Sequence, residues 1–235
     1  MASESKSFIS EISNASPLTT VGIAAGTRRL AANLTSLLEV GLVFGLIMVA
    51  VWTPQGRLNT AASLAAALFT VGLTVRSGFS ARDLGLRRPF SGAIVILAAG
   101  ALLVAVIVAS GAFARVLGPP QPLPWNHAWQ YAIWALLQQF IVQSFMFVRL
   151  ESVLGGRRAV LASSLLFAAA HLPSPLLTAL SLIGAVFFCE LFRRYRNLFP
   201  LGLVHAALGL TIAASLPDSL LHHMRVGIGY LMYHG

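Results

Sequence analysis

The stretch that decides the fold runs from residue 129 to residue 205 and places short polar motifs inside long apolar segments. In order, it contains Leu137-Gln138-Gln139-Phe140-Ile141-Val142-Gln143, then Phe167-Ala168-Ala169-Ala170-His171, and then Pro200-Leu201-Gly202-Leu203-Val204-His205. Amide and imidazole side chains are costly in hydrocarbon unless they find hydrogen-bond partners. Three such motifs in neighbouring apolar segments therefore predict a functional site inside a membrane, with the rest of the chain as its scaffold.

The composition indicates a membrane protein made of helices. Of the 235 residues, 57% are hydrophobic and only 10% are charged, and the mean hydropathy is +0.80. Long runs almost free of charge are typical of polytopic helical membrane proteins. The short alternating segments of a transmembrane barrel are absent. We therefore predict an all-α membrane bundle of about seven spans, within a range of six to eight.

Turn and charge signals divide the chain into three parts. Residues 1–33 are predicted to be a cytoplasmic arm, residues 34–215 the integral membrane domain, and residues 216–235 a tail. Whether the tail forms an extra membrane-associated helix is left open, because its apolar run Val226–Tyr233 is too short to cross a bilayer. The predicted spans are Leu34–Trp52, Leu58–Val75, Phe90–Leu117, Trp125–Val148, Ala159–His171, Leu176–Phe192 and Leu198–Ser215.

Basic residues lie in alternate connections between these spans. All but three of the sixteen Lys and Arg residues fall on one side, in the arm and in the basic loops 76–88, 149–158 and 193–196. The positive-inside rule makes this side cytoplasmic and places the N-terminus there. The formal charge of +9 is thus read as an orientation signal, and the expected surroundings are a lipid bilayer and not nucleic acid.

The polar motifs are predicted to meet near the middle of the membrane. Gln139 and Gln143 are four residues apart and share a helix face, with Gln138 beside them, and Phe167 and His171 share a face in the same way. His205 would face the same space from the last span. The alternative interpretation is that these groups only tie helices together, because interhelical hydrogen bonds are common in membrane bundles.

The other ionisable groups in the apolar segments are mostly expected to have structural roles. Glu39 lies inside the first span and is kept as a possible binding residue. Glu190 is expected to pair with Arg193 or Arg194, and the single Cys189 is expected to be a buried, inert thiol. No metal or cofactor is expected, because two His residues without a carboxylate make an incomplete zinc shell.

The order of the motifs resembles the CAAX prenyl protease and bacteriocin-processing family of intramembrane endopeptidases. Members carry Glu-Glu-x-x-x-Arg on one span, Phe-x-x-x-His on the next and His-x-x-x-Asn on a later one. The resemblance covers about residues 83–209 and includes Asp83-Leu-Gly-Leu-Arg-Arg-Pro89 and Arg196-Asn-Leu-Phe-Pro-Leu-Gly-Leu-Val-His-Ala206. It implies a peptide or a membrane-anchored protein as substrate and the plasma (inner) membrane of a bacterium as location.

The departures from this pattern concern the catalytic residues. Gln138 and Gln139 stand where the family has Glu, Gln143 stands where it has Arg, and Gly209 stands where it has Asn. In the family, one Glu is thought to activate water, and an amide cannot accept that proton. The resemblance leaves His171 and His205 as the catalytic candidates, with Gln138 and Gln139 in the catalytic positions and Gln143 and Phe167 as binding residues.

Three functions follow as hypotheses. The first is an endopeptidase that uses His171 or His205 as the base. The second is a catalytically silent relative that binds a peptide, a lipid tail or a partner helix in a neutral cavity. A small transporter is the third and is disfavoured, because no inverted repeat is evident.

Overall fold

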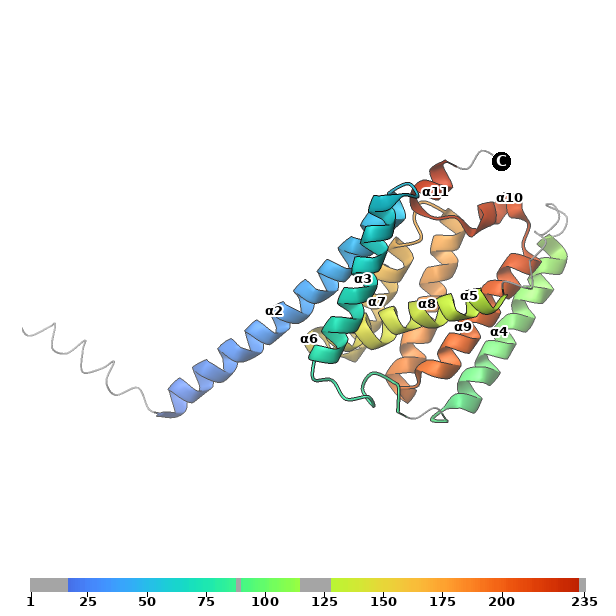
Figure 1. Ribbon diagram of the computed structural model, residues 1–235. Helices are drawn as coiled ribbons and strands as arrows, with labels where there is room; N and C mark the ends of the chain where they lie inside the picture. Colours follow the sequence, from blue (N-terminus) through green and yellow to red (C-terminus); the bar gives the residue numbers. More distant parts are fainter. Residues whose placement is uncertain (1–16, 88–89, 115–127, 233–235) are drawn as a thin grey trace, which may run out of the picture.

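The computed structural model describes residues 17–87, 90–114 and 128–232, which form a bundle of helices (Figure 1). In order, the elements are α2 (Pro17–Trp52), α3 (Arg57–Arg76), α4 (Ala93–Ala114), α5 (Ala128–Gln139), the π-helical segment η3 (Phe140–Phe147), α6 (Val148–Leu154), α7 (Gly156–Ala169), α8 (Pro175–Tyr195), α9 (Leu198–Ser215), α10 (Asp218–Leu221), the 3₁₀ turn η4 (His222–Met224) and α11 (Gly227–Leu231). No strand occurs within the described ranges, and the prediction of an all-α fold is confirmed.

Six helical stretches in the described part of the chain are long and apolar enough to cross a membrane, so the chain is a multi-pass integral membrane protein. They correspond to six of the seven predicted spans, and their number lies within the predicted range of six to eight. The exception is the predicted span Ala159–His171. Helix α7 has 14 residues and is about 21 Å long at 1.5 Å per residue, which is less than the ~30 Å of a hydrocarbon core.

Two other segments are helical where the sequence analysis did not expect a helix, and a third predicted segment cannot be compared. Helix α2 begins at Pro17, so residues 17–33 of the expected arm continue the first span as helix. The expected basic loop Arg149–Arg158 is helical except for Gly155. Gly155 has a φ of 79°, and one glycine in the left-handed region is enough to turn the chain between two helices. The predicted loop Gly118–Pro124 lies outside the described residues.

The tail folds back onto the bundle. It consists of the short helices α10 and α11 joined by η4, and α11 packs against α2. The backbone N–H of Gly227 donates a hydrogen bond to the carbonyl of Leu172 at 2.7 Å. With 4 residues in α10 and 5 in α11, neither helix can cross a bilayer at about 1.5 Å per residue.

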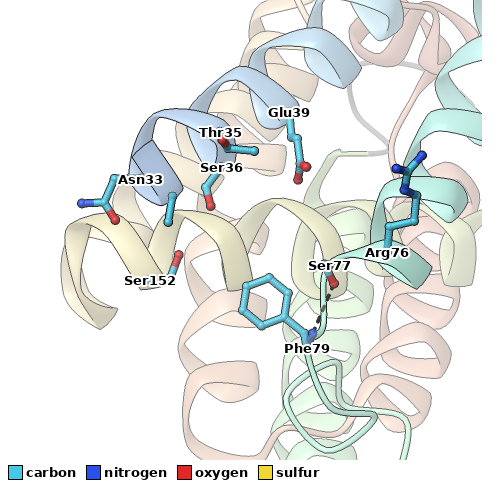
Figure 2. Close-up of a pocket in the computed structure, with 9 residues that line it drawn as sticks. Asn33, Thr35, Ser36, Glu39, Arg76, Ser77, Phe79 and Ser152 are labelled. Atoms are coloured by element: carbon cyan, nitrogen blue, oxygen red, sulfur yellow. Dashed lines mark hydrogen bonds between the residues drawn. The ribbon is translucent and has the colours of Figure 1, made fainter. Parts of the chain in front are cut away.

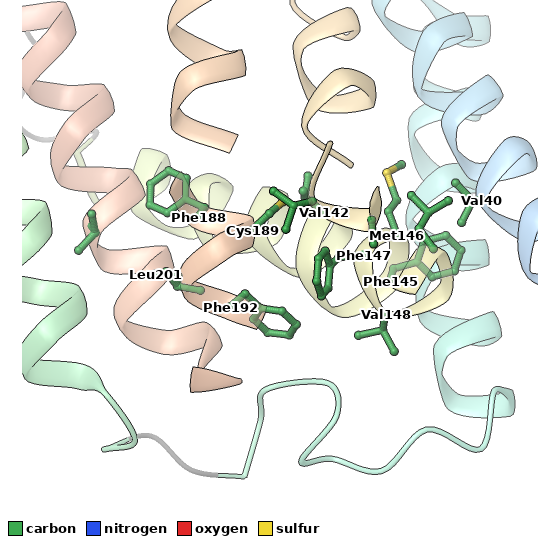
Figure 3. Close-up of a cluster of buried hydrophobic side chains, with 14 of the residues drawn as sticks. Val40, Val142, Phe145, Met146, Phe147, Val148, Phe188, Cys189, Phe192 and Leu201 are labelled. Atoms are coloured by element: carbon green, nitrogen blue, oxygen red, sulfur yellow. The ribbon is translucent and has the colours of Figure 1, made fainter. Parts of the chain in front are cut away.

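The central element is the continuous helix formed by α5, η3 and α6. Half of the most apolar stretch of this helix is buried, the largest share among the six candidate spans. Figure 3 shows its Phe147 on the side of Phe192 of α8 and Leu201 of α9, and its Phe145 on the opposite side, toward Val40 of α2. Both of these phenylalanines, Phe192 and Leu201 are fully buried. The ring of Phe147 meets that of Phe192 edge-on at 5.8 Å between centroids. Helix α9 in turn packs against α4 and α5, so η3 lies inside the bundle.

The arginine-rich segments lie at one end of the bundle (Figure 1). The N–H of Leu198, which begins α9, donates to the carbonyl of Gly85 at 3.0 Å, and Arg196 forms an ion pair with Glu151 of α6. The expected pairing of Glu190 is confirmed, because its carboxylate binds Arg193 at 2.7 Å and Arg194 at 2.6 Å. This is the end of the bundle that the sequence predicts to be cytoplasmic.

Candidate functional site

Three of the predicted site residues form one hydrogen-bonded chain between α5, η3 and α9. The Gln139 Nε2 atom lies 3.0 Å from Nδ1 of His205, and Nε2 of Gln143 donates to Oε1 of Gln139 at 3.2 Å. Gln139 is 3% exposed and Gln143 is fully buried. The expectation that the two glutamines share a helix face is therefore confirmed, and the amides connect directly to an imidazole from a helix 66 residues away.

The chain of bonds assigns the protons on His205. With the amides oriented as they are in the structure, Gln143 donates to the oxygen of Gln139, so the nitrogen of Gln139 faces His205. An amide nitrogen only donates, which makes Nδ1 of a neutral His205 the acceptor. The proton of this neutral imidazole is then on Nε2.

His171 has the opposite arrangement. Its Nδ1 atom lies 2.7 Å from the backbone carbonyl oxygen of Phe167, just beyond the end of α7 at Ala169. A carbonyl only accepts, so Nδ1 of His171 carries the proton. In the neutral imidazole, Nε2 then has a free lone pair. One histidine thus offers a proton acceptor and the other offers a donor.

Both imidazoles lie against the ring of Phe167. Its ring centroid is 4.6 Å from that of His171 and 6.0 Å from that of His205. The other side of the site is formed by Phe188 of α8, whose ring lies 5.4 Å from His205. Both imidazoles are half-buried. The two imidazoles share Phe167 as a neighbour.

The wall behind Gln143 is polar and neutral. The Cys189 thiol of α8 lies near Gln143 and Ser164 of α7, and Cys189 is fully buried as predicted. Within the described residues, Oε1 of Gln143 and the hydroxyls of Ser163 and Ser164 have no hydrogen-bond partner. Buried polar atoms are usually paired, so this wall retains hydrogen-bonding capacity for water or for a bound molecule.

Two predicted site residues stand apart from this chain of bonds. Gln138 is half-buried beside Gln139, and its side chain makes no hydrogen bond to the described residues. Glu39 pairs with Arg149, with 2.6 Å between Oε2 and Nε. Arg149 lies about 1.7 helical turns beyond Gln143 on the central helix, so Glu39 pairs with Arg149 and not with the glutamine and histidine cluster.

The burial of Arg149 is a feature that the sequence did not predict. This residue is 1% exposed, and its NH2 group donates to the carbonyl of Leu73 at 2.9 Å. Its guanidinium stacks on the ring of Phe145 at 3.9 Å. The signal that could have revealed it was Glu39, an acidic residue inside an apolar span, which needs a cationic partner.

Tyr131 is a second residue that the sequence analysis missed. A methyl group added at Gly209 would lie 1.9 Å from the Tyr131 hydroxyl. Gly209 is one helical turn beyond His205 on α9 and stands at the position of the family's Asn. The missing side chain therefore makes room for the phenol of α5, which brings a hydroxyl group to this side of the site.

The site is built from neutral polar groups. Among the residues that the structure describes, no group of three or more His, Cys, Asp or Glu side chains could hold a metal ion. The assembled site consists instead of two imidazoles, two amides, a thiol and hydroxyl groups. Such a set can donate, accept and move single protons without a resident carboxylate.

Comparison with known proteins gives one match. Residues 119–211 match the family model described as Type II CAAX prenyl endopeptidase Rce1-like. This segment contains the glutamine pair, both histidines and Gly209. No curated protein and no solved structure gives a significant match.

Proposed function

We propose that the chain is a member of the CAAX protease family, whose model matches residues 119–211, and that it hydrolyses a peptide bond in a membrane-associated protein through its two histidines. The matched model names prenyl endopeptidases, which suggests a lipid-modified or membrane-anchored peptide as substrate. The observations that carry the proposal are the contacts of Nδ1 of His205 with the Gln139 amide and of Nδ1 of His171 with the Phe167 carbonyl, from which we infer opposite tautomers for the two histidines.

His171 is the proposed general base. Its Nδ1–H is held by the Phe167 carbonyl, so the lone pair on Nε2 can take a proton from water as the water oxygen attacks the peptide carbonyl carbon. A neutral imidazole is suited to this step near pH 7. In this role it replaces the carboxylate that Gln139 cannot supply.

His205 is the proposed donor to the oxyanion. Gln139 accepts from Gln143 and donates to Nδ1 of His205, which leaves Nε2–H to stabilise the negative charge on the former carbonyl oxygen. When the intermediate collapses, the C–N bond breaks and the protonated His171 gives its proton to the leaving amine. Water is thereby divided between the new carboxylic acid and the new amine.

A cleavage assay with purified protein in lipid vesicles tests this proposal. The substrates are a prenylated peptide with a C-terminal CAAX-type sequence and the same peptide on a simple membrane anchor. His171→Ala and His205→Ala are each expected to lower the rate by about 10²–10⁴-fold. The matched control is His223→Ala in the tail, which is expected to leave the rate unchanged. Wild-type turnover no greater than that of His171→Ala would refute the proposal.

A second candidate function is a silent relative that binds a peptide, a lipid tail or a partner helix. It is favoured by the glutamine at position 139, which cannot accept a proton where the family has Glu, and by the neutral polar wall around Gln143. Mild detergent extraction followed by mass spectrometry tests it. A ligand that stays bound to the wild-type protein, together with the absence of cleavage, would support this second function. A Gln139→Glu exchange is expected to change retention without being required for it.

A further inference from the structure

The strongest feature outside the site is a polar pocket at the arginine-rich end of the bundle. Its volume is about 450 Å³, within the range of about 300–1,000 Å³ for small-molecule sites. It is enclosed by α2, the end of α3, the segment after α3 and α6. The lining residues are Ala32, Asn33, Thr35, Ser36, Glu39, Arg76, Ser77, Phe79 and Ser152.

Figure 2 shows Asn33, Ser36 and Glu39 along α2, with Ser152 of α6 and Ser77 beyond them. The Asn33 amide and the Ser36 hydroxyl make no hydrogen bond to the described residues. Hydroxyl and amide groups of this kind suit a polar ligand with several oxygen atoms. The lining therefore differs from the apolar surface that the same helices turn to lipid.

Charge narrows the class of ligand. Arg76 is exposed at the last turn of α3 and has no ion-pair partner in the part of the chain that the structure describes. The other cation nearby, Arg149, is neutralised by Glu39 through a single carboxylate oxygen, Oε2. The pocket thus combines one available guanidinium, suited to a phosphate, with a carboxylate that is about a quarter exposed.

The position of the pocket in the bundle further limits the class of ligand. The pocket lies where α3 ends and the loop to α4 begins, so it stands at the level of the lipid headgroups if α3 crosses the membrane. Pockets between membrane helices with basic residues at this depth are suited to phospholipid headgroups. We propose that this pocket binds the headgroup of a phospholipid that carries both a phosphate and a primary amine, as in phosphatidylethanolamine. Arg76 binds the phosphate, and Glu39 accepts a hydrogen bond from the ammonium group.

Native mass spectrometry in detergent tests the proposal, with dissociation constants measured for added lipids. Phosphatidylethanolamine is expected to bind one site more tightly than phosphatidylglycerol, which lacks the amine, and phosphatidylcholine, which lacks the N–H donors. Arg76→Gln is expected to weaken this binding at least tenfold. Arg57→Gln, at the opposite end of the same helix, is the matched control and is expected to leave binding unchanged. Ser36→Leu fills the pocket without removing a charge and is expected to abolish the site.

Several results would overturn the proposal. Equal affinity for the three lipids would show a surface annulus and no specific site. An equal loss in Arg57→Gln and Arg76→Gln would show that net charge, and not the pocket, sets the affinity. Binding of inorganic phosphate or of soluble glycerophosphoethanolamine as tightly as the lipid would show a site for soluble phosphates. None of these outcomes depends on peptidase activity, so they are separate from the tests of the proposed function.

Discussion

Replacing Glu39 by Gln should destabilise the bundle more than the loss of any surface ion pair. The exchange leaves the Arg149 guanidinium, which is 1% exposed, without a countercharge. Removing one partner from a buried pair costs about 3–5 kcal/mol. Arg149 keeps its bond to the Leu73 carbonyl and its stacking on Phe145, so we expect about 3 kcal/mol, at the low end of this range. For a chain of this size, that lowers Tm by about 6–12 °C.

The buried thiol of Cys189 supplies the assay. It is the only cysteine in the chain and is fully buried, so a thiol-reactive fluorescent dye reacts only as the bundle opens on heating. The control is Glu190→Gln, which breaks the more exposed pairs with Arg193 and Arg194 and should cost no more than about 1 kcal/mol. The double exchange Glu39→Gln with Arg149→Met removes both charges and should recover most of the loss.

A Tm for Glu39→Gln within about 2 °C of wild type, or no lower than that of Glu190→Gln, would refute this reasoning. Such a result would mean that water reaches Arg149 and replaces the carboxylate. Failure of the double exchange to recover stability would show that the guanidinium contributes through its stacking and its backbone bonds and not through the ion pair.

Three further predictions concern the site and the loop after α3. The triple exchange of Gln138→Glu, Gln139→Glu and Gln143→Arg restores the motif of the family that the chain resembles. If the natural protein is silenced, this variant should cleave the peptide faster than wild type. Equal cleavage by the two proteins would place the chemistry on the histidines. Gly209→Ala should lower stability by about 1–3 kcal/mol because its methyl group meets the hydroxyl and the ring of Tyr131. A simultaneous Tyr131→Phe should relieve only part of this loss, because two ring carbons also lie within 2.8 Å of the added methyl group; unchanged melting of the single variant would count against the packing described. The Ser80 hydroxyl and backbone N–H hold the pKa of Asp83 below its ordinary value of 3.8. The stabilising effect of Asp83 should therefore be present above about pH 4 and be lost as the pH falls through the lower folded value. Melting curves of wild type and Asp83→Asn should converge there, and a constant difference down to pH 2 would contradict the assignment.

The sequence alone determined the position of most spans. Apolar runs ended by turn signals located α3, α8 and α9 to within a few residues, because a helix in lipid must satisfy its own backbone and so depends mainly on local composition. The four-residue spacing of Gln139 and Gln143 likewise fixed their common face. The pairing of Glu190 followed from spacing as well, since its partners lie within one turn.

Tertiary packing decided what depends on partners distant in the chain. Arg149 looked like part of a basic loop, and only the close approach of α2 and α3 to α6 shows it buried against Glu39 and Leu73. The position of Tyr131 over Gly209 depends in the same way on the contact between α5 and α9.

The histidines show the same division between sequence and structure. The sequence predicted that His171 and His205 would meet, because both interrupt apolar segments at similar depth. Which nitrogen of each carries the proton was decided by a backbone carbonyl on α7 and an amide on α5. A tautomer depends on the single neighbour within hydrogen-bond distance, and that neighbour is set only when the helices pack.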